Sequence, residues 1–188
     1  MEINFHFYRG LSFISKIIKW RTRGIYSHVA IEIDNNVYEA WEKYGVVKAS
    51  STLENHTHKT PIDTIEINTK EIVAQNFKLF LEAQINKKYD WRAIISFIGS
   101  KNIQDKNRWF CSELANMFFV FEQKQQIKTH SELISPQRFF ERLKFYKIGI
   151  NKGKKMNEVA LKNQHSLEQI SCATTTTKIP KIMATSSS

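Results

Sequence analysis

The chain has 188 residues, of which 41% are hydrophobic and 12% aromatic, and its 28 Lys and Arg outnumber 18 Asp and Glu to give a formal net charge of +10. This composition can bury a core, which excludes a wholly disordered or a collagen-like chain. No apolar stretch approaches the roughly 20 residues of a membrane span, and the N-terminus lacks the pattern of a secretory signal, so we expect a cytoplasmic protein by default.

Hydrophobic periodicity predicts an α+β domain. Alternating apolar and polar side chains are typical of half-buried strands, and apolar residues three and four apart are typical of amphipathic helices. Asp and Asn between two β-rich segments indicate a hairpin turn. In the first part of the chain, the sequence predicts a strand over 3–8, a helix from a Ser12 cap to Trp20, and hairpin strands over 25–33 and 37–41 around the turn Asp34-Asn35-Asn36. A strand over 46–49, a surface loop over 50–60 and a strand over 62–67 are predicted next. The remaining predicted elements are helices over 71–86, 91–98 and about 111–124, a helix from Ser135-Pro136 to Leu143, and a last strand over 145–150.

The chain beyond Asn151 loses this periodicity. Its six lysines face only two glutamates, and it ends in runs of threonine and serine. Such a segment buries too little apolar surface to offset the entropy of ordering. We therefore predict a catalytic or binding domain over residues 1–150 and a basic, low-complexity, disordered tail over residues 151–188.

The positive charge favours anionic partners, such as nucleic acid, an anionic membrane surface or an anionic polymer. A helix-turn-helix, zinc-finger or RNA-binding signature is missing, so no specific nucleic acid is expected, although a non-enzymatic basic nucleic-acid-binding module is an alternative. The segment Leu11–Arg23 is both apolar and basic. It can lie on a membrane surface, but an ordinary amphipathic helix packed on the sheet is the favoured interpretation. The oligomeric state stays open.

The two cysteines lie in contrasting surroundings and do not form a disulfide scaffold. Cys172 lies in the polar tail, whereas Cys111 opens a predicted helix whose next turns are apolar. The N–H groups and partial positive charge of a helix N-terminus stabilise a thiolate, and they can later hold an oxyanion. The commoner role of a lone cysteine at such a place is that of a small buried apolar residue.

Histidines supply the candidate base. His28 lies inside a predicted strand, and the small Ala30 on the same face leaves room for another element to approach. A core histidine without a chemical role fits equally well. The histidines at positions 56, 58, 130 and 165 are predicted to be solvated in loops, and His6 has no further signal. Because His56-x-His58 lacks partners at zinc-like spacing, neither a metal nor a cofactor is predicted.

A cysteine nucleophile needs a base whose tautomer is fixed by a neighbouring carboxylate or amide. Glu39 and Glu42 are candidates on the return strand of the hairpin, with Glu32 and Asp34 on the first strand. A three-residue turn sets Glu42 opposite His28. A two-residue turn puts Glu39 on the face of the histidine, offset along the strand. Spacing alone leaves this choice open.

Five short motifs within residues 5–145 stand out together. They are Ser27-His28-Val29-Ala30-Ile31, Val37-Tyr38-Glu39-Ala40, Lys88-Tyr89-Asp90-Trp91, Phe110-Cys111-Ser112-Glu113-Leu114 and Ser135-Pro136. In this order they resemble the circularly permuted papain-like amidases, the YiiX/YaeF-type branch of the NlpC-like cell-wall hydrolase superfamily, in which the histidine strand precedes the cysteine helix. The resemblance implies a permuted papain-like fold, with an antiparallel sheet packed against helices and the cysteine at a helix N-terminus.

The resemblance also implies a catalytic triad. Cys111 would be the nucleophile, His28 the general base and Glu39 the residue that orients the imidazole, and we expect Cys111 and His28 to form a thiolate–imidazolium pair. Tyr89 and Asp90 match a recurrent motif near the active-site groove and are candidate substrate-binding residues.

The implied reaction is hydrolysis of an amide through a thioester acyl-enzyme, with a peptidoglycan-type peptide as the first guess for the substrate. The same scaffold also serves acyltransferases and hydrolases of lipid esters, so the acyl donor can be a peptide or a lipid. The chain departs from the wall-active members by lacking an export signal and a wall-binding domain, and a phage or prophage origin would suit that departure.

Overall fold

The computed structural model describes residues 1–57, 59–92, 107–123 and 134–152. The chain forms two compact units, Met1–Phe145 and Tyr146–Ser188. The first unit is α+β and packs an antiparallel sheet against helices, as the sequence predicts. Among the helices of the described residues, none combines the length and the apolar character needed to cross a bilayer.

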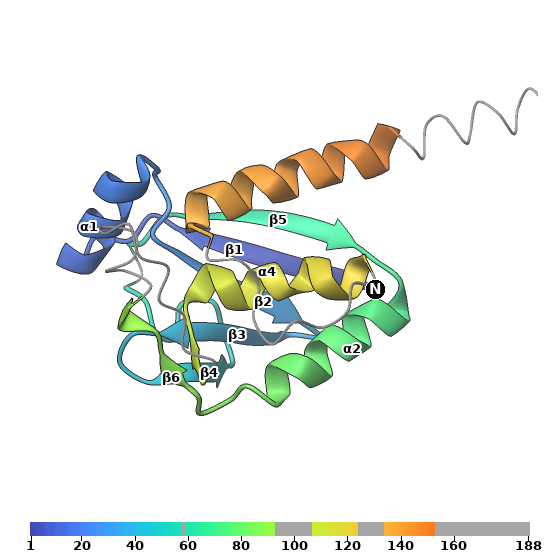
Figure 1. The fold of residues 1–188 in the computed structure, drawn as a ribbon, viewed down its shortest axis with the longest axis horizontal. Coiled ribbons are helices and arrows are strands. Elements are labelled where there is room, and N and C mark those ends of the chain that lie inside the picture. Colours follow the sequence, from blue (N-terminus) through green and yellow to red (C-terminus); the bar gives the residue numbers. More distant parts are fainter. Residues whose placement is uncertain (58, 93–106, 124–133, 153–188) are drawn as a thin grey trace, which may run out of the picture. The chain divides into compact units, whose positions relative to one another are not determined.

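Five strands form an antiparallel sheet in the order β4-β3-β2-β1-β5 (Figure 1). β1 is first in sequence and lies inside the sheet, with a neighbour on each side. Two short strands, β6 and β7, pair in parallel outside this sheet, and β7 lies just before α4 in the sequence. The strands are β1 Glu2–Tyr8, β2 His28–Ile33, β3 Asn36–Trp41, β4 Gly45–Ala49, β5 Ile62–Asn68, β6 Lys88–Tyr89 and β7 Arg108–Trp109.

The helices of the first unit are α1 Phe13–Thr22, α2 Glu71–Glu82, α4 Cys111–Glu122 and a further helix over residues 136–145. Ser12 caps α1 as predicted, because its hydroxyl oxygen accepts the backbone N–H of Ser15 at 3.1 Å. α4 packs on β2, β3 and α2 (Figure 1). Apart from helical residues 91 and 92, the predicted helix 91–98 lies outside the described residues.

The predicted strand over residues 145–150 is wrong. Residues 136–145 are helical, and residues 146–152 of the second unit are helical as well. No proline or glycine interrupts the chain between Pro136 and Gly149, so a helix started at Ser135-Pro136 continues past Leu143. The predicted tail beyond residue 152 lies outside the described residues.

The two faces of the sheet bury different residues. On one face, the Phe5 ring of β1 packs against Phe118 of α4 and Phe139 of the last helix, with ring centroids 5.5 Å apart in both pairs. Tyr8 and His28 lie on the opposite face, with ring centroids 5.3 Å apart. Aromatic side chains contribute large buried areas, so the first face fixes α4, and with it Cys111, against the sheet.

The hairpin between β2 and β3 turns through two residues. Asp34 and Asn35 have φ angles of 51° and 58°, and Ile33 pairs with Asn36. Positive φ at both central positions is what a tight two-residue hairpin turn requires, and Asp and Asn tolerate it. The observed turn is therefore one residue shorter than the predicted turn Asp34-Asn35-Asn36, because Asn36 belongs to β3.

Candidate active site

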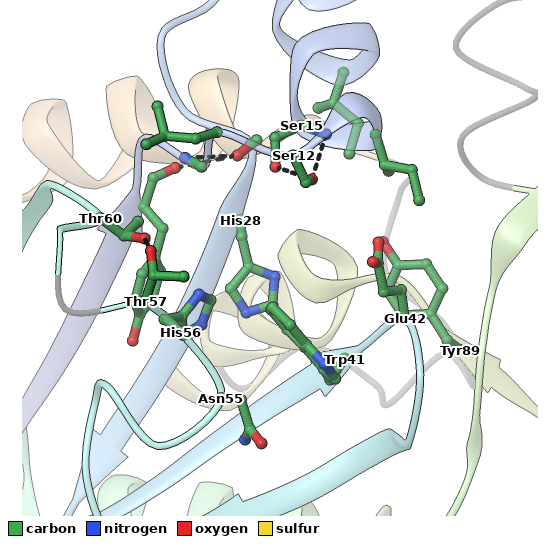
Figure 2. Close-up of a pocket in the computed structure, with 16 residues that line it drawn as sticks. Ser12, Ser15, His28, Trp41, Glu42, Asn55, His56, Thr57, Thr60 and Tyr89 are labelled. Carbon is green, nitrogen blue, oxygen red and sulfur yellow. Dashed lines mark hydrogen bonds between the residues drawn. The ribbon is translucent and has the colours of Figure 1, made fainter.

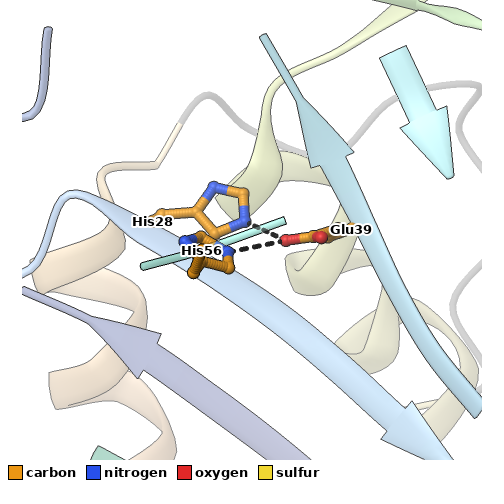
Figure 3. A group of neighbouring side chains, drawn as sticks. All are labelled: His28, Glu39 and His56. Carbon is orange, nitrogen blue, oxygen red and sulfur yellow. Dashed lines mark hydrogen bonds and ion pairs between the residues drawn. The ribbon is translucent and has the colours of Figure 1, made fainter. Parts of the chain in front are cut away.

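A buried carboxylate lies at the centre of the candidate site. Glu39 is 2% exposed. Its Oε2 accepts hydrogen bonds from Nε2 of His28 at 2.8 Å and from Nε2 of His56 at 3.0 Å (Figure 3). Its Oε1 accepts the side-chain amide of Asn55 at 2.7 Å. Strands β2 and β3 and the loop after β4 thus supply four polar side chains that satisfy one another.

The hairpin register decides between the two candidate acids. With Ile33 opposite Asn36, Glu39 lies on the same face of the sheet as His28, offset by two residues. This is the arrangement expected from a two-residue turn. Glu42 follows the end of β3 and lines a neighbouring pocket. Glu39 is therefore the carboxylate that orients His28.

The hydrogen bond to Glu39 fixes the tautomer of His28. An ionised carboxylate only accepts, so Nε2 of the neutral imidazole carries the proton and Nδ1 keeps its lone pair. Burial lowers the pKa of His28, and this outweighs the raising effect of Glu39. Burial acts to raise the pKa of Glu39, but the hydrogen bonds from His28, His56 and Asn55 outweigh it and lower that pKa. The neutral imidazole is thus a base at Nδ1.

Cys111 lies near the start of β2, on the face of the sheet against which α4 packs. It is the first residue of α4 and is 1% exposed. The backbone N–H groups of Val29, Ser112 and Cys111 itself lie near its sulfur and act to lower the pKa of the thiol. Val29 follows His28 directly in β2, so the structure brings the thiol to the start of the strand that carries the imidazole. Within the described residues, Cys111 and His28 share no hydrogen bond.

The resting thiol is protonated, which corrects the expected thiolate–imidazolium pair. Burial raises the pKa of Cys111 to about 12, and the charge of Glu39 acts in the same direction. The three backbone N–H groups lower the pKa of the thiol, but less than burial raises it. Loss of hydration therefore outweighs the helix N-terminus.

A pocket of about 330 Å³ opens beside the two imidazoles. His28 and His56 lie next to each other in it, Ser12 and Ser15 come from the cap and first turn of α1, and Tyr89 closes another side (Figure 2). Cys111 is absent from the residues that line this pocket. A substrate in the pocket meets the imidazoles directly and reaches the sulfur only past covering side chains.

The two residues of the Tyr-Asp motif have different positions. Tyr89 lines the pocket, and burial raises the pKa of its phenol well above the usual value, which keeps it a neutral donor. Asp90 is buried away from the pocket, and its carboxylate accepts the backbone N–H of Arg92 at 2.9 Å. Tyr89 can contact a substrate, whereas Asp90 stabilises the local turn.

His56 is the site residue that sequence reasoning missed. The sequence predicts a solvated loop histidine, but the His56 side chain is 6% exposed and stacks on Tyr8 with ring centroids 3.9 Å apart. The loop residues 50–57 fold across the sheet face that Ala30 leaves open, and the backbone oxygen of Thr52 accepts a hydrogen bond from the Tyr8 hydroxyl at 2.9 Å. The small residue at position 30 is the one local signal that something covers this face.

His6 is likewise buried in a polar pair that the sequence did not indicate. Its Nε2 bonds Glu32 at 2.7 Å and its Nδ1 bonds Thr64 at 2.9 Å. These residues lie on β1, β2 and β5, away from the pocket lining. His6 is therefore a matched reference for a buried histidine–carboxylate pair outside the candidate site.

No protein-family model matches the chain, and no curated protein matches it either. The geometry of the site therefore carries the functional argument.

Acid is expected to destabilise the first unit in two stages. The pKa of His28 is lowered from 6.5, so the unfolded chain takes up this proton first, and stability falls as the pH drops below about 6.5. The pKa of Glu39 is lowered from 4.5, so a further loss begins below about 4.5. Urea midpoints between pH 8 and pH 3.5, measured with a chelator present, test both stages. A His28→Gln variant should lose the first stage, and a wild-type midpoint that stays constant between pH 8 and pH 5 would contradict the expectation.

Proposed function

We propose that the first unit is a cysteine-dependent acyl hydrolase on the permuted papain-like scaffold that the sequence motifs indicate. Cys111 is the nucleophile, His28 the general base and Glu39 the residue that orients the base. The observation that carries the proposal is the buried 2.8 Å hydrogen bond between Nε2 of His28 and Glu39, which leaves the lone pair of Nδ1 free to accept a proton. Cys111, the first residue of α4, lies close to the backbone of Val29, the residue that follows His28. Base, orienting group and nucleophile are the three parts of this chemistry.

The reaction begins from a neutral thiol and a neutral imidazole. As the sulfur bonds to the carbonyl carbon, Nδ1 of His28 takes the thiol proton, and the carbonyl electron pair moves to the oxygen. The backbone N–H of Cys111, at the N-terminus of α4, is the proposed donor for that oxyanion. The tetrahedral adduct then expels the amine, which leaves with the proton from His28. Water attacks the thioester, releases the acid and restores the thiol.

An amide of a peptide is the first candidate substrate. The pocket mixes apolar walls with hydroxyl and amide side chains, and Glu42 adds a carboxylate at its edge. Such a lining suits a chain of amide bonds that carries a cationic group. Peptidoglycan-type peptides have this chemistry.

The test is an acyl adduct on Cys111. The full chain is incubated with peptidoglycan-type peptides, phospholipids and the small ester p-nitrophenyl acetate, and its intact mass and modified residue are determined. The small ester is included because Cys111 is almost fully covered. A Cys172→Ser variant should still form the adduct. An adduct that persists in Cys111→Ala, or the absence of any adduct with the small ester, would refute the proposal.

A lipid ester is the second candidate, and the exposure of α1 favours it. Phe13 is 77% exposed and Trp20 75% exposed, and Ile18 is the one fully buried residue of the helix. Lys16, Lys19, Arg21 and Arg23 lie in or next to the same helix, which contains no acidic residue. Exposed aromatic and basic side chains together are typical of a helix that lies in an anionic membrane interface. Other residues of α1 line the pocket, so a bound membrane would lie beside its entrance.

Vesicle binding distinguishes this candidate. Vesicles of phosphatidylglycerol and phosphatidylcholine should bind the full chain at low salt and shift the fluorescence of Trp20 to shorter wavelength. A lysine near an anionic surface contributes about 1 kcal/mol, so Lys16→Ala should weaken binding about fivefold. Lys70→Ala, which removes an exposed lysine before α2, should leave binding unchanged. Equal binding to vesicles of phosphatidylcholine alone, or no binding, would exclude the membrane surface.

A further inference from the structure

Three ligand-type atoms converge in the candidate site. Nitrogens of His28 and His56 and a carboxylate oxygen of Glu39 all lie within 4.8 Å of one another. Both imidazoles direct Nε2 at the same oxygen, Oε2 of Glu39 (Figure 3). They arrive from β2 and from the loop after β4, while Glu39 arrives from β3. A catalytic triad has no use for the second imidazole, so His56 calls for a separate explanation.

The donor set suits a divalent ion of the zinc class. Catalytic zinc sites use three protein ligands, two histidines and a glutamate among the common sets, with bond lengths of about 2.0–2.2 Å and one open position. Tetrahedral bonds of that length place neighbouring donor atoms about 3.3 Å apart. The distances of 2.8 Å and 3.0 Å from Oε2 to the two nitrogens need only a small outward movement. The two nitrogens, which lie within 4.8 Å of each other, must also come to about this separation. Each neutral ring would then carry its proton on Nδ1 and present the Nε2 lone pair to the ion.

The surroundings hold the ligands in place. Asn55 donates to Oε1, the other oxygen of Glu39, at 2.7 Å, as outer partners of metal-bound carboxylates do. His28 contacts the ring of Trp41, and His56 stacks on Tyr8. Both histidines also line the pocket, which gives an ion a path to the site and leaves a side open for water or a ligand (Figure 2).

We propose that His28, Glu39 and His56 form a binding site for a divalent metal ion of the zinc class, open towards the pocket. The site is independent of the thiol. Where the proposed hydrolase function also holds, the ion and the base compete for His28, because metal at Nε2 puts the proton on Nδ1 and removes the lone pair that accepts the thiol proton. Zinc then inhibits acylation of Cys111 reversibly.

Zinc titration of the full, metal-stripped chain tests the site by calorimetry. The Cys111→Ala variant is used as the parent, because it cannot be acylated and so tests metal binding alone. It should bind one zinc equivalent that both His56→Gln and Glu39→Gln lose. Asn55→Ala should weaken that equivalent about 10- to 100-fold, as loss of an outer partner does. His6→Gln, which alters a buried histidine with one carboxylate partner, should bind like the parent.

Equal stoichiometry and affinity in the parent, His56→Gln and Glu39→Gln would overturn the proposal, because zinc would then bind elsewhere. Should these variants fail to fold, the imidazole ¹⁵N resonances of the parent decide. Zinc should shift the Nε2 signals of His28 and His56 and leave those of His6 in place, and unchanged His28 and His56 signals would overturn the site. Acylation of metal-free wild type is measured separately, so failure of the hydrolase proposal and failure of the metal site give different results.

Discussion

His28→Ala is expected to slow acylation of Cys111 by about 10²- to 10⁴-fold, the range typical for loss of a general base. The reason is the protonation state of the thiol. Burial raises the pKa of Cys111 to about 12, so no reserve of thiolate exists at neutral pH and the proton must leave as the sulfur attacks. Single-turnover release of p-nitrophenol from p-nitrophenyl acetate, with intact mass as a second readout, measures the rate.

Matched variants separate loss of the base from loss of the fold. Glu39→Gln keeps the size of the side chain but weakens the orientation of His28, so its loss of rate should be smaller than that of His28→Ala. His6→Ala removes a buried histidine outside the site and should acylate at the wild-type rate. Added imidazole should partly restore His28→Ala, because it can enter the space left in the pocket. A wild-type rate in His28→Ala would leave Cys111 without its proposed base.

Local patterns were sufficient for most of the fold. The alternation of Ile3, Phe5 and Phe7 with polar residues predicts a strand, and Asp34 with Asn35 predicts the hairpin turn. These features depend on a few adjacent residues, which is why periodicity and turn chemistry find them. Residues 145–150 carry apolar side chains at spacings that fit a strand or a helix, and the preceding helix decides between them by continuing.

In the candidate site, too, the sequence predicts the contacts between residues close in the chain but not those between distant ones. His28 and Glu39 lie on a hairpin, so their relation follows from the length of one turn. His56 reaches Glu39 only because a loop folds back over the sheet, and no short-range pattern encodes that contact. The predicted thiolate at Cys111 is wrong for the same reason. A helix N-terminus is visible in the sequence, but the degree of burial is a property of the whole packed unit.

Gly45→Ala is expected to destabilise the first unit by about 2–4 kcal/mol, from backbone strain together with overpacking. Gly45 has a φ of +78°, a conformation that alanine adopts only with strain. A Cβ at this position would also clash with the backbone carbonyl oxygen of Lys87. That oxygen accepts the N–H of Val46 at 2.8 Å, so moving it away breaks the contact that joins β4 to the segment before β6.

The urea midpoint of unfolding measures this loss, with Gly149→Ala as the control. A Cβ at Gly149 has no atom within 4 Å, so the same chemical change should cost nothing at that position, and its helical backbone favours alanine. The substitution at Gly45 also bears on the site, because Lys87 lies two residues before Tyr89 and displacement of this segment shifts a wall of the pocket. Gly45→Ala should therefore lower the rate of acylation even at temperatures where the variant stays folded. Equal urea midpoints for Gly45→Ala and Gly149→Ala would contradict this expectation. They would mean that the segment around Lys87 can move without loss of stability and does not hold Tyr89 in position.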